Sequence, residues 1–139
     1  MALLAVIFMS MYAALTSSVH FAVLTLSRQP ELITTASAAL VFSFTWPSVV
    51  YALDILAWDV FFPLGALFAA LAVPHTGRKR LVRQLLYASS ALAFLGLVGI
   101  PLANMNVRNV GIIGYVVLFP IAAVLYGATL KQSGAKSAA

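Results

Sequence analysis

The chain has 139 residues, of which 63% are hydrophobic and 8% are charged, with a formal net charge of +5 and no cysteine. Soluble domains usually contain about 25% charged residues, so this composition excludes a soluble globular protein and predicts an all-α, multi-pass transmembrane bundle. The lack of cysteine excludes disulfides, thiolate metal sites and covalent c-type haem within the chain.

The first predicted span covers residues 2–26. It has no basic n-region and is longer than the apolar part of a signal peptide, so we interpret it as a retained span. Residues 32–45 are shorter and more polar, and we expect an interfacial or re-entrant segment there. The second span, 47–73, begins at Trp46 and Pro47, a pair typical of a helix start at the membrane interface.

The third and fourth spans are predicted at 81–103 and 110–130. Together the four spans form one bundle over residues 1–131, and residues 132–139 are predicted to be a disordered tail. A five-span alternative would need a turn within residues 53–57, where no Gly, Pro or Asn offers one. We therefore favour four spans.

The basic residues predict the orientation. Four of them crowd between the second and third spans: Arg78, Lys79, Arg80 and Arg83. In a four-span arrangement Lys131 and Lys136 lie on the same side, so the positive-inside rule places both termini in the cytoplasm. We expect the basic cluster to contact anionic lipid headgroups, and we predict no nucleic-acid partner.

Two carboxylates, Asp54 and Asp59, lie within the second span. An ionised carboxylate at the bilayer centre costs about 2.5–3.5 kcal/mol on insertion scales, so such residues normally face the bundle interior. In a regular α-helix, residues five apart differ by about 140° in direction, so we expect no tight dyad. Matching depths along the helices predicts a contact between His20 and Asp54, and a hydrogen bond from Thr16 or Ser17 to Asp59.

These polar pairs have two interpretations. They form a site that binds a proton or ligand, to which Tyr51 and Trp58 would also belong, or they form a polar clamp between helices. We favour the clamp, because interhelical polar contacts are common in bundles, and we favour anchoring and packing for the aromatic residues. Arg108, in the turn before the fourth span, is expected to contact headgroups, with Glu31 or Asp54 as alternative partners.

No metal or cofactor site is predicted. His75 lies across the membrane from His20, so one chain cannot supply two histidines to one haem. Ligation of a pigment by His20 alone is a minor alternative. The sequence contains no nucleophile elbow, phosphate-binding glycine loop or metal signature. We therefore assign no catalytic residue and expect a protein that is not an enzyme.

Glycine and proline predict local features of the bundle. Glycine pairs spaced three apart should allow close approach of helices: Gly96 with Gly99, and Gly111 with Gly114. Pro63 and Pro120 should kink the second and fourth spans.

Two stretches, 52–62 (ALDILAWDVFF) and 108–115 (RNVGIIGY), resemble those of a family of small, uncharacterised bacterial four-span membrane proteins. The resemblance implies a bacterial inner-membrane protein with four spans, and it implies no activity. We expect an accessory or assembly subunit of a larger membrane complex, partnered by other subunits or by copies of itself. Two alternatives stay open: a small transporter or ligand- or proton-binding protein, and an enzyme acting on a lipophilic substrate.

Overall fold

The computed structural model describes residues 1–33 and 36–137, which contain helices and no β-strand. Four helical segments are long and apolar enough to cross a membrane: Ala2–Thr25, Val49–Ala72, Gly77–Gly99 and Met105–Gln132. An all-α, multi-pass architecture with four spans is therefore confirmed.

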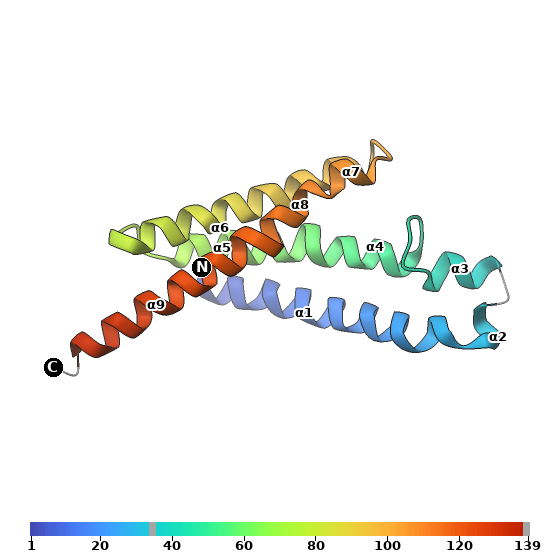
Figure 1. Ribbon diagram of the computed structural model, residues 1–139, viewed down its shortest axis with the longest axis horizontal. Coiled ribbons are helices and arrows are strands. Elements are labelled where there is room, and N and C mark those ends of the chain that lie inside the picture. Colours follow the sequence, from blue (N-terminus) through green and yellow to red (C-terminus); the bar gives the residue numbers. More distant parts are fainter. Residues whose placement is uncertain (34–35, 138–139) are drawn as a thin grey trace.

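The first span is α1 (Ala2–Thr25), which continues into a 3₁₀ turn at Leu26–Arg28. Two short helices follow, α2 (Pro30–Ile33) and α3 (Ala36–Phe42). Both are much shorter than the roughly 20 residues needed to cross a bilayer, so this segment adds no fifth span. Figure 1 shows α2 and α3 at the end of the bundle where α1 ends and α4 begins. Part of the predicted interfacial segment, residues 34–35, lies outside the described residues.

The second span consists of α4 (Val49–Leu56), a π-helical turn (Ala57–Phe61) and α5 (Phe62–Ala72). Helix α4 begins after Ser48, whose Oγ accepts a hydrogen bond of 3.2 Å from the backbone N–H of Tyr51. Serine is a favoured residue at this position, because its oxygen satisfies an N–H that has no partner within the helix.

The third span is α6 (Gly77–Gly96) with a 3₁₀ turn at Leu97–Gly99. It begins four residues before the predicted start at Leu81, so the predicted basic loop is the first part of α6. Lysine and arginine favour helix, which explains why α6 extends beyond its apolar stretch. The buried face of α6 carries small side chains at helical spacing: Ser89, Ser90, Ala93 and Gly96.

The fourth span consists of α7 (Met105–Arg108), α8 (Val110–Ile112), a π-helical turn (Ile113–Leu118) and α9 (Phe119–Ser137). The side chain of Asn104 caps α7 by accepting two backbone hydrogen bonds.

Helix α9 runs past the predicted span end at Leu130 and into the predicted disordered tail. The tail is therefore helical up to Ser137, and residues 138–139 lie outside the described residues. Alanine, lysine and glutamine in this stretch favour helix, so the end of the apolar stretch does not end the helix.

Each π-helical turn directly precedes a proline-containing helix. Pro63 and Pro120 are the second residues of α5 and α9. The turns are closed by i→i+5 hydrogen bonds, from Phe62 N–H to Ala57 O and from Phe119 N–H to Gly114 O. Proline has no N–H and clashes with the carbonyl four residues earlier, and a wider turn relieves both problems. The irregularity predicted at both prolines thus takes the form of a π-helical turn.

The helices pack around α5 and α6, which lie side by side (Figure 1). One buried cluster joins α5, α6 and α9 and includes Ala70, Val82, Leu86 and Ala122. A second is centred on Phe62, Ala66 and Ala93. Coverage is uneven: 44% of the apolar stretch of the second span is buried, but only 11% of that of α1. Helix α1 therefore has the smallest buried share of the four spans, with 17% for the fourth span and 33% for the third.

Candidate intramembrane polar site

A buried ion pair joins the second and fourth spans. Asp59 lies in the π-helical turn of the second span and is fully buried. Arg108, the last residue of α7, is 6% exposed, and its Nε donates a hydrogen bond of 2.9 Å to Asp59 Oδ2. A charge-assisted hydrogen bond of this length is among the stronger polar interactions in proteins. It connects two segments that are 49 residues apart in the chain.

Asp54 belongs to the same cluster but is held less closely. Its Oδ2 lies 4.0 Å from Arg108 Nη2, and the residue is 6% exposed. The Arg108 guanidinium also lies over the ring of Tyr51, 5.6 Å from its centre. Both carboxylates therefore face one guanidinium, and Asp59 is its closer partner.

The two aspartates converge because of the π-helical turn between them. Our expectation that they point in different directions assumed a regular α-helix. A π-helix closes its hydrogen bonds from residue i to i+5, so residues five apart lie nearer to one face. The turn at Ala57–Phe61 lets both carboxylates face Arg108, so the separation expected for a regular α-helix is not kept. The expectation that the two carboxylates form no tight dyad stays a prediction.

Glycines allow the helices to approach closely around the cluster of Asp54, Asp59 and Arg108. A Cβ on Gly96 would lie 2.8 Å from the backbone oxygen of Arg108 and 3.3 Å from Asp59 Oδ1. A Cβ on Gly111 would lie 3.1 Å from Asp59 Oδ1, and one on Gly99 would lie 2.5 Å from the backbone nitrogen of Arg108. Side chains at Gly96 and Gly99 would thus collide with backbone. The predicted role of these glycines in close helix approach is confirmed.

The predicted contact between His20 and Asp54 is not found as a hydrogen bond or ion pair among the described residues, although the two side chains interact electrostatically. His20 Nδ1 lies 2.9 Å from the backbone oxygen of Thr16, within its own helix, and the ring packs beside Phe44. Among the described residues, the ion-pair partner of both aspartates is Arg108. Matching depth along two helices leaves their rotation undetermined, and the rotation of α1 turns His20 toward the exterior.

The predicted hydrogen bond from Thr16 or Ser17 to Asp59 is also wrong. Thr16 Oγ1 is buried without a hydrogen-bond partner in the described part of the chain, and so is Asp59 Oδ1. Ser17 is exposed. The headgroup contact favoured for Arg108 is replaced by the buried ion pair. The signal that could have revealed it was charge: two acidic side chains in one span require a cation, and Arg108 lies in the first turn of the fourth span.

The aromatic candidates have packing partners. Trp58 lies between Tyr12 and Tyr115, with ring centres 4.7 and 4.6 Å away. Tyr51 packs against Phe44, with ring centres 5.3 Å apart. These contacts agree with the packing interpretation and place Trp58 and Tyr51 beside the polar cluster.

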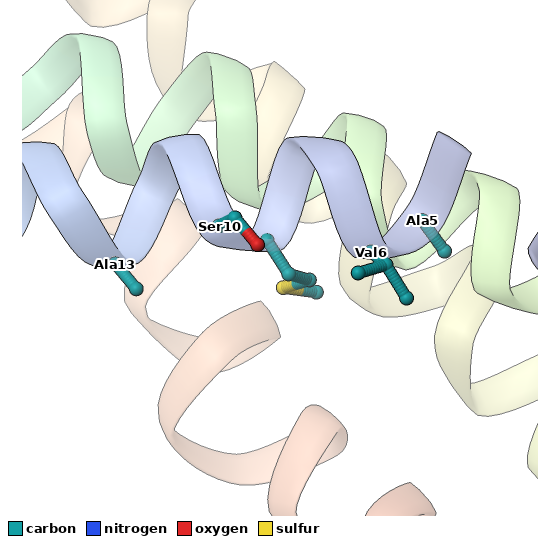
Figure 2. Close-up of a pocket in the computed structure, with 5 residues that line it drawn as sticks. Ala5, Val6, Ser10 and Ala13 are labelled. Atoms are coloured by element: carbon teal, nitrogen blue, oxygen red, sulfur yellow. The ribbon is translucent and has the colours of Figure 1, made fainter. Parts of the chain in front are cut away.

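Three cavities lined by described residues lie elsewhere. The first, of about 340 Å³, is a groove on α1 lined by Ala5, Val6, Met9, Ser10 and Ala13. Figure 2 shows that its labelled residues lie on the same side of α1. The second lies between the start of α6 and α9, lined by Arg78, Leu81, Leu125, Ala128 and Thr129, and the third lies on α9 near Pro120. The described residues contain no group of three or more side chains suited to hold a metal ion.

Fold and site together define an integral, multi-pass α-helical membrane protein with a buried ion pair between its second and fourth spans. Comparison with protein-family models, curated proteins and solved structures finds no match. The resemblance to small bacterial four-span proteins and the bacterial inner-membrane location therefore stay predictions.

Proposed function

We propose that the protein is a non-catalytic subunit that assembles with another membrane chain through α1. The observation that carries this proposal is the uncovered surface of α1, of whose apolar stretch only 11% is buried. The groove of about 340 Å³ lies on this surface.

Polar groups inside the bundle serve the bundle itself. Ser89 Oγ donates to the backbone oxygen of Gly114, and Ser90 Oγ donates to that of Pro63, both at 2.8 Å. These bonds join α6 to the fourth and second spans, and the pair of Asp59 and Arg108 joins those two spans directly. Interhelical polar contacts of this kind fix helix register in a bilayer. This use of the polar residues supports a structural role over a catalytic one.

The groove has the residue composition of a helix-packing surface. Alanine and serine let a second helix approach the backbone closely, and dispersion and polar contacts then replace contacts with lipid. Met9, which also lines the groove, packs against Gly65 of α5, where an added Cβ would lie 2.9 Å from Met9 Cγ. Helix α1 is thus held in the bundle beside the groove, and the groove stays open to a helix of a partner chain.

The basic cluster supports the orientation that goes with this role. Arg78 Nη1 donates a hydrogen bond of 3.4 Å to Gln132 Oε1, so the start of α6 and the late part of α9 lie at the same end of the bundle. The arginines and lysine of α6 therefore share a side with Lys131. We infer that this is the cytoplasmic side, and that the basic residues contact anionic headgroups there.

Filling the groove tests the proposal. We expect Ser10→Phe to dissociate the complex extracted from the source membrane, because the larger ring occupies the volume of the partner helix. Leu95→Phe, at an exposed position of α6, should leave the complex intact. Native mass spectrometry gives the stoichiometry for both variants, and circular dichroism reports whether the four-span fold is kept. A wild-type protein that is monomeric after gentle extraction would contradict the proposal.

A transport or ligand-binding function is the second candidate. It would require a cavity at Asp54 or Asp59, and the three cavities described above are lined by other residues. What favours it is the incomplete pairing of the two carboxylates.

A further inference from the structure

The polar cluster is short of one positive charge. Asp54 and Asp59 would carry two negative charges if both were ionised, and Arg108 supplies one positive charge. All three residues are at most 6% exposed. A net buried charge is expensive in a low-dielectric medium unless it is paired or neutralised. Such a cluster therefore favours the uptake of one further positive charge.

The two carboxylates are unequally stabilised as anions. Asp59 accepts a direct hydrogen bond from Arg108 Nε at 2.9 Å, which is the geometry of an ionised pair. Both carboxylates have a buried Oδ1 without a hydrogen-bond partner among the described residues, but Asp54 Oδ2 is 4.0 Å from the guanidinium, beyond hydrogen-bonding distance. Asp54 is thus the poorer site for a negative charge and the better site for a bound cation.

The groups facing Asp54 come from three spans. From its own span come Asp59 and Trp58, which interact with it electrostatically, and Tyr51, which lies against the Arg108 guanidinium. From α1 come His20 and Tyr12, and from the fourth span come Arg108 and Tyr115, all of which interact with Asp54 electrostatically. The buried face of α6 carries only glycine, alanine and serine at this level. The candidates for a balancing charge among these are His20 and a proton on Asp54 itself.

His20 is poorly placed to supply that charge. It is exposed, forms no ion pair with Asp54 within the part of the chain that the structure describes, and engages Nδ1 with the carbonyl of Thr16. A carbonyl oxygen only accepts, so Nδ1–H of His20 donates to Thr16 rather than to Asp54. Binding of a divalent metal ion is also disfavoured, because the described residues offer no set of three ligands.

We propose that Asp54 is an intramembrane proton-binding site, which holds one proton from water while Asp59 stays ionised and paired with Arg108. The proton makes the cluster electrically neutral without any further ligand.

The composition of the chain gives a direct test. Asp54 and Asp59 are its only aspartates, so protein labelled with carbon-13 at the aspartate carboxyl carbon reports these two groups alone. In lipid vesicles at pH 7, free of added metal ions, we expect one protonated and one ionised carboxyl signal, by solid-state nuclear magnetic resonance or infrared spectroscopy. Asp54→Asn should remove the protonated signal and keep the ionised one.

Charge counting predicts the remaining variants. In Asp59→Asn, Arg108 is left to balance Asp54, so the single carboxyl should be ionised. In Arg108→Gln both carboxyls should be protonated. His20→Gln should retain the wild-type pattern of one protonated and one ionised signal.

Two ionised signals in the wild type would overturn the proposal, and so would a protonated signal that survives Asp54→Asn. A protonated signal that disappears when sodium ions are added in place of choline would assign the site to a metal cation instead. If Arg108→Gln does not fold, the Asp54→Asn and Asp59→Asn variants still decide the question.

Discussion

Removal of Arg108 should destabilise the bundle more than removal of either aspartate. Arg108→Gln replaces the guanidinium with a shorter, neutral amide, so two buried carboxylates lose their only ion-pair partner among the described residues. Breaking a buried ion pair by removing one partner costs about 3–5 kcal/mol. We expect the loss of stability to lie at the lower end of this range if the carboxylates that lose Arg108 become protonated. Folded proteins are stable by about 5–15 kcal/mol, so this is a large share.

The contacts of the two aspartates predict how much stability each of the other variants loses. Asp59→Asn removes the negative charge from the 2.9 Å hydrogen bond, but Asp54 stays 4.0 Å from the guanidinium and balances its charge, so a smaller loss is expected. Asp54→Asn removes no direct hydrogen bond to Arg108 and should cost no more than about 0.5–1.5 kcal/mol, the usual contribution of one neutral hydrogen bond. The expected order of cost is Arg108→Gln, then Asp59→Asn, then Asp54→Asn.

The assay is reversible unfolding in mixed micelles by titration with a denaturing detergent, followed by helical circular dichroism. Arg80→Gln, which removes an exposed arginine from α6, is the matched control and should change the free energy of unfolding by less than about 0.5 kcal/mol. Replacing both partners, as in Asp59→Leu with Arg108→Met, should recover most of the loss, because apolar residues need no counter-charge. An Arg108→Gln cost equal to that of Arg80→Gln would refute the reasoning.

Three further predictions concern packing and orientation. Gly99→Ala should destabilise the bundle by about 1–3 kcal/mol, because its Cβ meets the Arg108 backbone, whereas Gly127→Ala, with open space around it, should be neutral or slightly stabilising; equal unfolding midpoints would contradict this. Ser90→Ala should cost about 0.6–1.7 kcal/mol by leaving the Pro63 carbonyl without its donor, measured by the same titration, and an unchanged stability would show that the bond contributes nothing. A reporter fused after residue 137 should be active only on the cytoplasmic side, and neutralising the α6 basic cluster should weaken that preference.

The number of spans was predictable because a bilayer leaves the chain few choices. Backbone groups in lipid must be hydrogen-bonded within the chain, so a long apolar stretch becomes a helix. The ends were less predictable. The third span begins at Gly77 and the fourth continues to Ser137, because lysine, arginine, glutamine and alanine extend a helix into water. Hydropathy locates the lipid-embedded part of each helix and leaves its ends undetermined.

The polar site was only partly predictable. Charge within a span identified Asp54 and Asp59, since an unpaired carboxylate in lipid is expensive. Arg108 was named only as an alternative partner of Asp54, and its pairing with Asp59 was missed, for two reasons. Depth along a helix does not determine which way a side chain points, and the π-helical turn at Ala57–Phe61 changes that direction. Arg108 begins its span, where an arginine ordinarily reaches toward headgroups.

The proline, the glycines and the ion pair depend on one another. Pro63 favours the wide turn that brings Asp59 to the same side as Asp54. The missing side chains at Gly96 and Gly99 let α7 approach α6 closely enough for Arg108 to reach that side. Once Arg108 pairs with Asp59, it leaves Asp54 with one oxygen 4.0 Å away and the other without a partner. The ion pair between Asp59 and Arg108 therefore leaves Asp54 incompletely paired. The pair has the structural role of joining the spans, and Asp54 has the proposed proton-binding role.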